Sequence, residues 1–254
     1  MYKLYIVHQT KCGCYKAKTP IKPIGILVHS TGADNPNLRR YVDAEEPLGK
    51  NPNGNHWNRP ELTVQVHAFI GKDKAGEVAV AETLPKNIAC WGCGRGKNGS
   101  YNYEPTPYIQ FEICEQQGDK AYFYKVFAVA AEYCADLCRN FGWDETRITS
   151  HGEAAKAGYA SNHGDPDHWL ARYGRDMNWF RSEVARRLSA AEPIAPDTPA
   201  AEHTTPDNPA AEYTTPTAAA SAEPTTPDTP AAEPPKECPL LRLIKWLGAL
   251  FKKK

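Results

Sequence analysis

The amino-acid composition changes at Ser189, and this change confines a folded core to the residues before it. Pro, Thr, Ala and Glu dominate residues 189–235, where the unit PDTPAAE recurs with little change. A segment of this composition has almost no apolar surface to bury, so we expect an extended, disordered linker. The chain therefore divides into a domain at 1–188, a linker at 189–235 and a C-terminal segment at 236–254.

Within the C-terminal segment, residues 238–254 predict a short amphipathic helix. The apolar residues between Leu240 and Phe251 fall on one side of this helix, whereas Arg242 and Lys245 lie off that side. A basic amphipathic helix beyond a linker is typical of segments that contact anionic surfaces, here a membrane or an acidic wall polymer. The alternative is a helix that docks on its own domain or oligomerises.

The net charge of zero is the sum of unlike regions. Residues 189–235 carry eight acidic and no basic residues, and residues 236–254 carry six basic residues and one acidic, which leaves +3 for residues 1–188. A charge this small gives no argument for a nucleic-acid partner. No apolar run approaches the ~20 residues of a membrane span, and none near the N-terminus is long enough for a signal peptide. We therefore expect synthesis as a soluble cytoplasmic protein.

The eight cysteines, in a long chain that lacks a signal peptide, indicate free thiols rather than a disulfide framework. Cys134 and Cys138 share the apolar face of a predicted helix, so we expect them in the core. Cys90 and Cys93 have the CxxC spacing of redox and metal sites. A Gly-rich loop follows this pair in place of the βαβ unit of a thioredoxin-like motif, so a function for it is the less favoured alternative.

Apolar periodicity in residues 1–188 predicts strands and helices in mixed order. The predicted strands are Gly25–His29, Thr63–Ile70, Glu77–Thr83, Tyr108–Cys114 and Arg147–Ser150, and the predicted helices are Ala121–Phe141 and Asp176–Leu188. The second and third strands should form a hairpin-like pair. In the fourth, Ile109, Phe111 and Ile113 are expected to face the core. This order indicates an α/β fold, a single domain with a central mixed β-sheet flanked by helices.

Histidines and acidic residues are concentrated in residues 150–169, SHGEAAKAGYASNHGDPDHW. A hydrolytic zinc site needs three ligands of the His, Cys, Asp or Glu type and an open position for water. His29 and His151 are each predicted at the end of a strand, where a rigid backbone can direct the imidazole outward. A single histidine in such a place is more often structural, but two of them together with His163 and Asp165 favour a metal site.

Four motifs of the chain, ILVHST, VHAFIGKD, YIQFEICE and SHGEAAKAGYASNHGDPDHW, resemble those of a known family. In this order and spacing they are similar to the zinc-dependent N-acetylmuramoyl-L-alanine amidases of the type 2 amidase and peptidoglycan-recognition-protein superfamily. The resemblance covers about residues 3–185 and is closest to forms from phages and prophages of Gram-positive bacteria. It implies a peptidoglycan hydrolase, an endolysin, that cleaves the amide between N-acetylmuramic acid and the L-alanine of the stem peptide.

The resemblance also implies roles for individual residues. His29, His151 and Asp165 take the positions of the ligands of one zinc ion, and Glu112 takes that of the catalytic glutamate. His163 stands where many members have a catalytic lysine, and it can donate a hydrogen bond to the developing oxyanion. Unlike lysine, histidine need not be charged at neutral pH, which allows an activity optimum on the acidic side.

Two further residues are candidates for contact with the substrate. His67, in the predicted strand Thr63–Ile70, faces either the cleft or the core. Trp91 could line the cleft against sugar or peptide. Many family members have a histidine after this tryptophan, whereas this chain has Gly92.

Alternatives remain for the site and for the function. Glu153 either orients a ligand imidazole or starts a helix, and His168 and Asp167 are rival metal ligands. The same chemistry fits a bacterial autolysin, and a non-catalytic peptidoglycan-binding module is a third interpretation, although all three expected ligands are present. Without a signal peptide, the enzyme would be made in the bacterial cytoplasm and would act on the cell wall after release.

Overall fold

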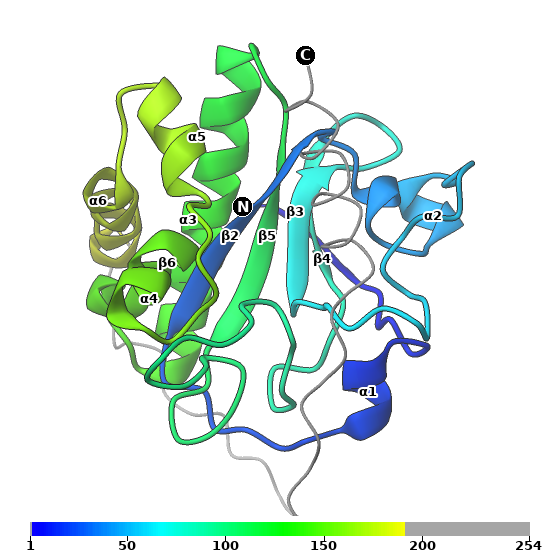
Figure 1. The fold of residues 1–254 in the computed structure, drawn as a ribbon. Coiled ribbons are helices and arrows are strands. Elements are labelled where there is room, and N and C mark those ends of the chain that lie inside the picture. The colour runs from blue at the N-terminus through cyan, green and yellow to red at the C-terminus, as the bar shows by residue number, and fades with distance from the viewer. Residues whose placement is uncertain (1, 191–254) are drawn as a thin grey trace, which may run out of the picture. The chain divides into compact units, whose positions relative to one another are not determined.

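The computed structural model describes residues 2–190 (Figure 1). Most of the predicted linker at 189–235 and the whole predicted helix at 238–254 lie outside the described residues. Within the described part of the chain, no helix combines the length and the apolar character needed to span a membrane.

A mixed six-stranded sheet with the order β1-β4-β3-β5-β2-β6 organises the domain. Its strands are β1 (Lys3–Ile6), β2 (Ile26–Asp34), β3 (Ala68–Lys72), β4 (Val78–Glu82), β5 (Ile109–Glu115) and β6 (Ile148–Ser150). β3 pairs antiparallel with β4, as the predicted hairpin requires, and the other pairs are parallel. The carboxyl ends of β3, β5, β2 and β6 therefore lie at one edge of the sheet.

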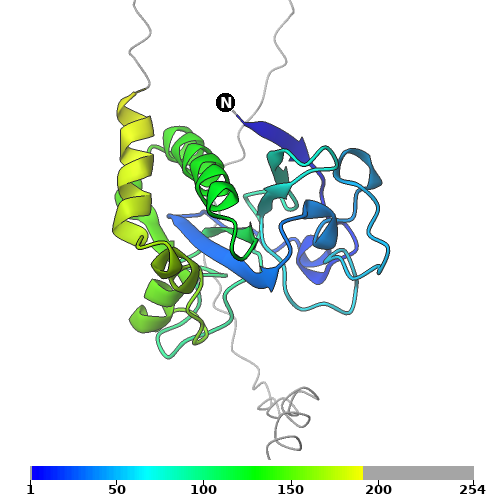
Figure 2. The same ribbon diagram turned by 90° about the horizontal axis from the view of Figure 1, so that it is seen from above.

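Helices and long connections cover the two faces of this sheet. The helices are α1 (Gly13–Ala17), α2 (Glu45–Leu48), α3 (Lys120–Phe141), α4 (His151–Ala157), α5 (Asp167–Arg172) and α6 (Met177–Ser189). Figures 1 and 2 show α3 and α6 together on one side of the sheet, and α1 and α2 with their connections on the other. The predicted α/β fold with a central mixed sheet is confirmed.

The central strand β5 is buried along its whole length. Ile109, Phe111 and Ile113 face the main apolar cluster under α3, as their alternation predicts. Gln110 and Glu112 point to the opposite face, and they too are buried; the loop between β4 and β5 contacts Gln110 through Tyr101 and Asn102. A polar side chain held there needs partners or a function.

The long helix α3 supplies the other half of the main core. Asp119 caps its start by accepting a hydrogen bond from the backbone N–H of Tyr122 (2.9 Å), and Gly142 ends it with a φ of 69°. Cys134 and Cys138 are buried on its inner face, as predicted. The seven cysteines among residues 2–190 are all free and buried, which confirms the prediction of free thiols for them.

Two predicted strands differ from the structure in ways that affect the site. β2 continues to Asp34, so His29 lies inside a strand and not at its end. β3 begins at Ala68 and not at Thr63. His67 still makes backbone hydrogen bonds to Gln110 and Thr83, but the carbonyl of Gln65 accepts a hydrogen bond from the N–H of Trp91 (3.1 Å), in the loop between β4 and β5.

Candidate metal centre

Three side chains from separate elements converge near the carboxyl edge of the sheet. His29 lies in β2, His151 is the first residue of α4 directly after β6, and Asp165 lies in the loop between α4 and α5. β2 pairs in parallel with both β5 and β6, which brings the start of α4 beside His29. The sequence places these residues 122 and 14 positions apart along the chain, and the sheet brings them together.

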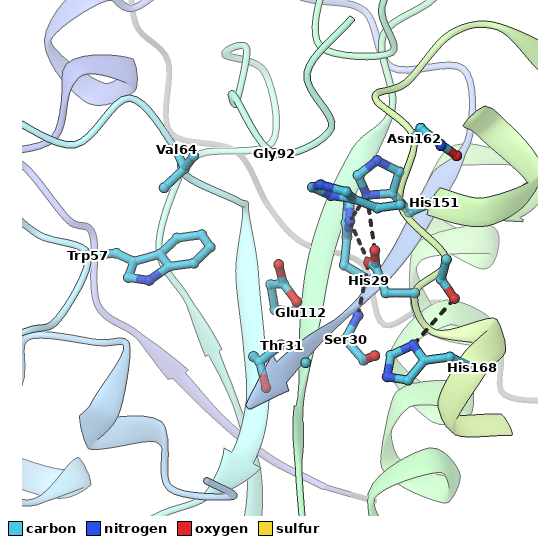
Figure 3. Close-up of a pocket in the computed structure, with 14 residues that line it drawn as sticks. His29, Ser30, Thr31, Trp57, Val64, Gly92, Glu112, His151, Asn162 and His168 are labelled. Atoms are coloured by element: carbon cyan, nitrogen blue, oxygen red, sulfur yellow. Dashed lines mark hydrogen bonds and ion pairs between the residues drawn. The ribbon is translucent and has the colours of Figure 1, made fainter. Parts of the chain in front are cut away.

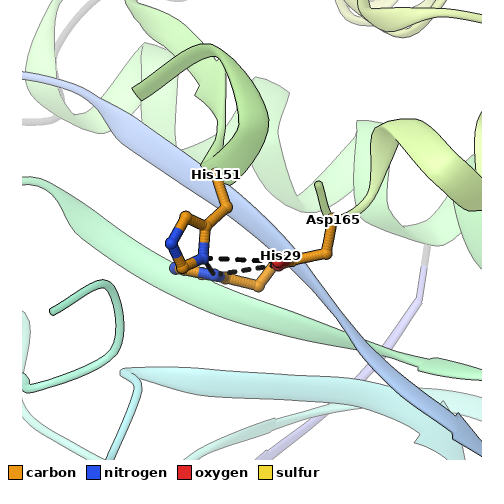
Figure 4. Close-up of side chains that lie close together, drawn as sticks. All are labelled: His29, His151 and Asp165. Atoms are coloured by element: carbon orange, nitrogen blue, oxygen red, sulfur yellow. Dashed lines mark hydrogen bonds and ion pairs between the residues drawn. The ribbon is translucent and has the colours of Figure 1, made fainter. Parts of the chain in front are cut away.

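The ligand atoms of the three side chains face one another (Figure 4). The Nδ1 atoms of His29 and His151 are 3.0 Å apart. One carboxylate oxygen of Asp165 lies 3.2 Å from the Nδ1 of His29, and the other lies 3.4 Å from the Nδ1 of His151. No other group of three His, Cys, Asp or Glu side chains in residues 2–190 converges in this way.

A hydrogen-bond network fixes the tautomer of His29. Its Nε2 lies 3.0 Å from the side-chain oxygen of Gln110. The amide nitrogen of Gln110 donates to the side-chain oxygen of Asn102 (2.9 Å) and the carbonyl of Tyr101 (3.2 Å), so its oxygen must face the histidine. His29 therefore donates from Nε2, which leaves a lone pair on Nδ1.

Hydrogen-bond acceptors fix the tautomer of His151 as well. Its Nε2 lies 3.0 Å from the backbone carbonyl of Ser161, which can only accept a hydrogen bond. The hydroxyl of Ser161 donates to the carbonyl of Cys93 (3.0 Å) and so also faces His151 as an acceptor. The proton of neutral His151 therefore lies on Nε2, and its Nδ1 lone pair points toward that of His29.

The charge of Asp165 completes a site for a cation. Its carboxylate faces both Nδ1 atoms, and one of its oxygens accepts a hydrogen bond from the backbone N–H of Ser30 (3.3 Å). Two nitrogen lone pairs and an ionised carboxylate then meet with no proton between the nitrogens. This donor set is the one that zinc takes in hydrolases, with three protein ligands of the His and carboxylate type.

The start of α4 is built to hold His151 in place. Ser150 and Glu153 form a capping box, in which each side chain binds the backbone N–H of the other residue. Arg181 of α6 binds the carboxylate of Glu153 at 2.9 Å. Glu153 therefore starts the helix, which was one of the two alternatives that the sequence left open.

The side chains of His29, His151 and Asp165 lie in a cleft of about 570 Å³ (Figure 3). Trp57 and Val64 form one wall, and His151, Asn162 and His168 line the other. Glu112 lies between the two walls. The cleft is therefore large enough to admit a ligand beside the three converging side chains.

Glu112 faces the cleft from β5 and stands opposite His29 in the β2–β5 register. Its side chain is nearly buried, and one carboxylate oxygen has no hydrogen-bond partner in the protein. Burial raises the pKa of Glu112 well above its ordinary value, and the carboxylates of Asp165 and Glu115 raise it further. An unpartnered carboxyl at this place is a candidate for proton transfer.

His163 and His168 both line the cleft. The ring centroid of His163 lies 4.9 Å from that of His151, and its side chain is exposed at the mouth of the cleft. His168 does not join the cluster of converging ligand atoms, because its Nε2 lies 3.0 Å from the carboxylate of Glu115. Asp167, the other rival ligand, is also outside that cluster.

The sequence profile of the N-acetylmuramoyl-L-alanine amidase family matches residues 19–168, which is more than half of the chain. The chain belongs to this family. It is therefore a peptidoglycan amidase, and the resemblance found in the four motifs is confirmed. The match begins after α1 and ends in α5, so it is narrower than the predicted 3–185.

The fold of this amidase is similar to that of a solved structure. The Staphylococcus aureus hydrolase AmiA in complex with its ligand is 20% identical over 73% of this chain and 83% of its own, with a TM-score of 0.50. A mutant endolysin from Bacillus subtilis is 21% identical over 72% of this chain and 99% of its own, with a TM-score of 0.49. No curated protein matches the chain significantly in sequence.

The structure places His67 of the amidase in the core, which was one of the two positions that the sequence left open. The side chain is fully buried, its Nε2 lies 3.0 Å from the carbonyl of Ile88, and its Nδ1 accepts from the N–H of Gln110 (3.0 Å). Burial lowers the pKa of His67 to about 4, so the ring is neutral. His67 holds β5 to the neighbouring loop and has no path to the cleft.

Trp91 lies in a second cavity of about 400 Å³ beside the cleft. The two cavities are adjacent along the chain, because Thr63 and Trp91 line the second one and their neighbours Val64 and Gly92 line the cleft. The sequence did not indicate this separation. It also gave no sign of the role of Gln110, whose only signal was its place on the same strand face as Glu112.

Proposed function

We propose that this amidase hydrolyses the bond between N-acetylmuramic acid and the L-alanine of the stem peptide with one Zn²⁺ held by His29, His151 and Asp165. The observation that carries the proposal is the convergence of two Nδ1 lone pairs on an ionised carboxylate. When bound there, zinc supplies a Lewis acid that polarises a carbonyl and lowers the pKa of water to roughly 7.

In this proposal Glu112 is the general base and then the general acid. It takes a proton from the water that adds to the carbonyl carbon, and it gives a proton to the nitrogen of L-alanine as the C–N bond breaks. Its carboxylate oxygen without a protein partner and its place on the floor of the cleft support this role. The products are the free lactyl carboxylate and the peptide amine.

His163 is the proposed donor to the oxyanion that forms on the carbonyl oxygen. Its exposed ring at the mouth of the cleft, next to His151, can reach a bound amide without rearrangement of β2 or β5. A donor positioned in advance stabilises the transition state more than the ground state. The resemblance to lysine-containing family members supports the same position.

We expect Glu112→Gln to lower the release of N-terminal L-alanine from purified peptidoglycan by about 10²–10⁴-fold, because the amide cannot accept the proton. The zinc content should stay at the wild-type level, since Glu112 is not a proposed ligand. Glu77→Gln is the matched control, because Glu77 forms an exposed ion pair with Lys125 away from the cleft. Wild-type alanine release by Glu112→Gln would exclude Glu112 as the proposed base.

The substrate is proposed to extend from the cleft into the cavity lined by Trp91. Tyr103 and Asn102 line the same cavity, so it offers aromatic surface and hydrogen-bonding groups, which suit a sugar ring or a peptide. The shared wall at 63–64 and 91–92 supports a continuous path for one polymer chain.

Trp91→Ala should raise KM for a muropeptide and leave kcat unchanged, because binding lost away from the reacting bond affects ground and transition states equally. Trp91→Tyr, which keeps an aromatic ring, is the matched variant and should have a smaller effect. Thermal unfolding checks that both variants are folded, since Trp91 packs beside Cys12 and Cys14. An unchanged KM in the folded Trp91→Ala variant would remove this cavity from the substrate path.

We propose a phage or prophage endolysin as the biological role, with an autolysin of the same chemistry as the alternative. The motif resemblance to phage enzymes supports the first, and a complete set of candidate ligands argues against a non-catalytic binding module. The enzyme would act on the wall after release from the cytoplasm. The basic residues of 238–254 are proposed to contact anionic membrane or wall polymer.

Deletion of residues 236–254 should leave cleavage of soluble muropeptide unchanged and weaken the lysis of whole cells. The reason is that a surface-binding segment raises the local concentration of the enzyme only on an extended anionic surface. Turbidity loss of cells and alanine release from soluble substrate measure the two activities. Equal loss on both substrates would show that the segment belongs to the catalytic fold.

A further inference from the structure

A second polar cluster lies next to the candidate metal centre, around the carboxylate of Glu115. Glu115 is the last residue of β5 and is only 1% exposed. One carboxylate oxygen accepts from the hydroxyl of Ser30 (2.7 Å) and from the backbone N–H of Gly32 (3.1 Å). The same oxygen lies 3.0 Å from the Nε2 of His168 in α5. One buried carboxylate therefore joins β2, β5 and α5.

His168 connects this carboxylate to the loop before Asp165. Its Nδ1 lies 3.3 Å from the carbonyl oxygen of Gly164, and its backbone N–H donates to the same oxygen (3.0 Å). Figure 3 shows the His168 ring at the cleft, on the side of this loop. The ring thus touches the end of β5 on one side and the residue between His163 and Asp165 on the other.

Asp165 meets β2 at the same place. The backbone N–H of Ser30 donates to its carboxylate (3.3 Å), while the Ser30 hydroxyl donates to Glu115. Two carboxylates from different elements therefore bind a single residue of β2, directly after His29. A shift in either carboxylate would change the position of the other relative to His29.

The loop that carries His163 and Asp165 has little support of its own. Residues 162–164 are exposed and lie outside the helices and strands. Its first part is held by the hydrogen bonds of Ser161 to His151 and to Cys93. Toward its other end, the carbonyl of Asp165 accepts a hydrogen bond from the N–H of Gly152 (3.2 Å), and His168 connects Gly164 to Glu115 of the sheet.

The pair is well suited to hold such a loop. A buried carboxylate is costly without partners, and His168 is the one potential cation within salt-bridge distance of Glu115 among residues 2–190. Loss of the imidazole would leave Glu115 with only the donors on β2. The carboxylate and the ring therefore favour a single arrangement of α5 against the sheet.

We propose that Glu115 and His168 are positioning residues, which hold the loop 162–165 against β2 and β5 and so set the places of Asp165 and His163. The inference rests on the proposed function in treating Asp165 as a ligand and His163 as a donor. Neither Glu115 nor His168 touches the metal or the reacting atoms in this account. Glu115 and His168 hold Asp165 in place beside the two histidine ligands before the metal binds.

The test measures zinc affinity of the full chain by competition with a chromophoric chelator. His168→Ala should weaken zinc binding by about 10–100-fold, which is the usual effect of losing a group that orients a ligand. His168→Gln should stay close to the wild type, because its amide nitrogen can still donate to Glu115. In a double variant, Glu115→Gln and His168→Ala together should weaken binding no more than His168→Ala alone.

Lys125→Ala is the control, since it removes an exposed ion pair with Glu77 on the outer side of α3. Circular dichroism and thermal unfolding of each metal-free variant separate a general loss of stability from a loss of zinc affinity. A folded His168→Ala variant with wild-type zinc affinity would overturn the proposal, whether or not its melting temperature falls. Should His168→Ala fail to fold, a folded His168→Leu variant with wild-type zinc affinity would overturn it, because leucine keeps the bulk of the side chain but cannot donate to Glu115.

The zinc content of the wild-type protein distinguishes a failure of the proposed function from a failure of the positioning role. A wild type that binds no zinc contradicts the proposed function itself. A wild type that binds one zinc ion, together with variants that bind it equally well, contradicts only the positioning role. Weaker binding by His168→Ala and recovery by His168→Gln would support both.

Discussion

The parallel pairing of β2 with β5 is the contact on which the site depends. It places His29 opposite Glu112 and leaves both side chains on the face that the cleft opens onto. The other face of the two strands carries Val28 and Phe111, which are fully buried against α3. Because a slip of one residue would exchange the two faces, the apolar core and the polar site fix the same register.

The orientation of the imidazoles follows from groups that can only accept hydrogen bonds. The side-chain oxygen of Gln110 accepts a hydrogen bond from the Nε2–H of His29, and the carbonyl of Ser161 accepts one from the Nε2–H of His151. Each Nδ1 is then available to a cation, and Asp165 supplies the negative charge. The protein thus places three electron-pair donors in contact, which is unfavourable unless a positive charge lies among them.

Strong periodicity allowed much of the fold to be predicted from the sequence. β5 and α3 are long enough for alternation and helical spacing to be unambiguous, and the buried Cys134 and Cys138 follow from the same pattern. The short elements β1 and α5 were missed, and α4 was indicated only by the alternative that Glu153 starts a helix. These elements have four, six and seven residues, which is too few for apolar repeats to indicate a type.

The candidate site, like the fold, was predicted only in part. The motifs led to His29, His151 and Asp165, which the fold brings together, and to Glu112 and His163 beside them. They gave a wrong strand end for His29 and left the position of His67 open. Gln110 and Glu115 were missed as supports of the site, because their partners are tens of residues away and the contacts exist only once the sheet has formed.

The most direct test of this account is anomalous diffraction at the zinc absorption edge from crystals of the full chain, together with the zinc content of the protein before crystallisation. We predict one zinc ion per chain and one anomalous peak, bound by the Nδ1 atoms of His29 and His151 and by the carboxylate of Asp165. A protein that is active on peptidoglycan with no zinc bound, or a peak at other side chains, would contradict the account.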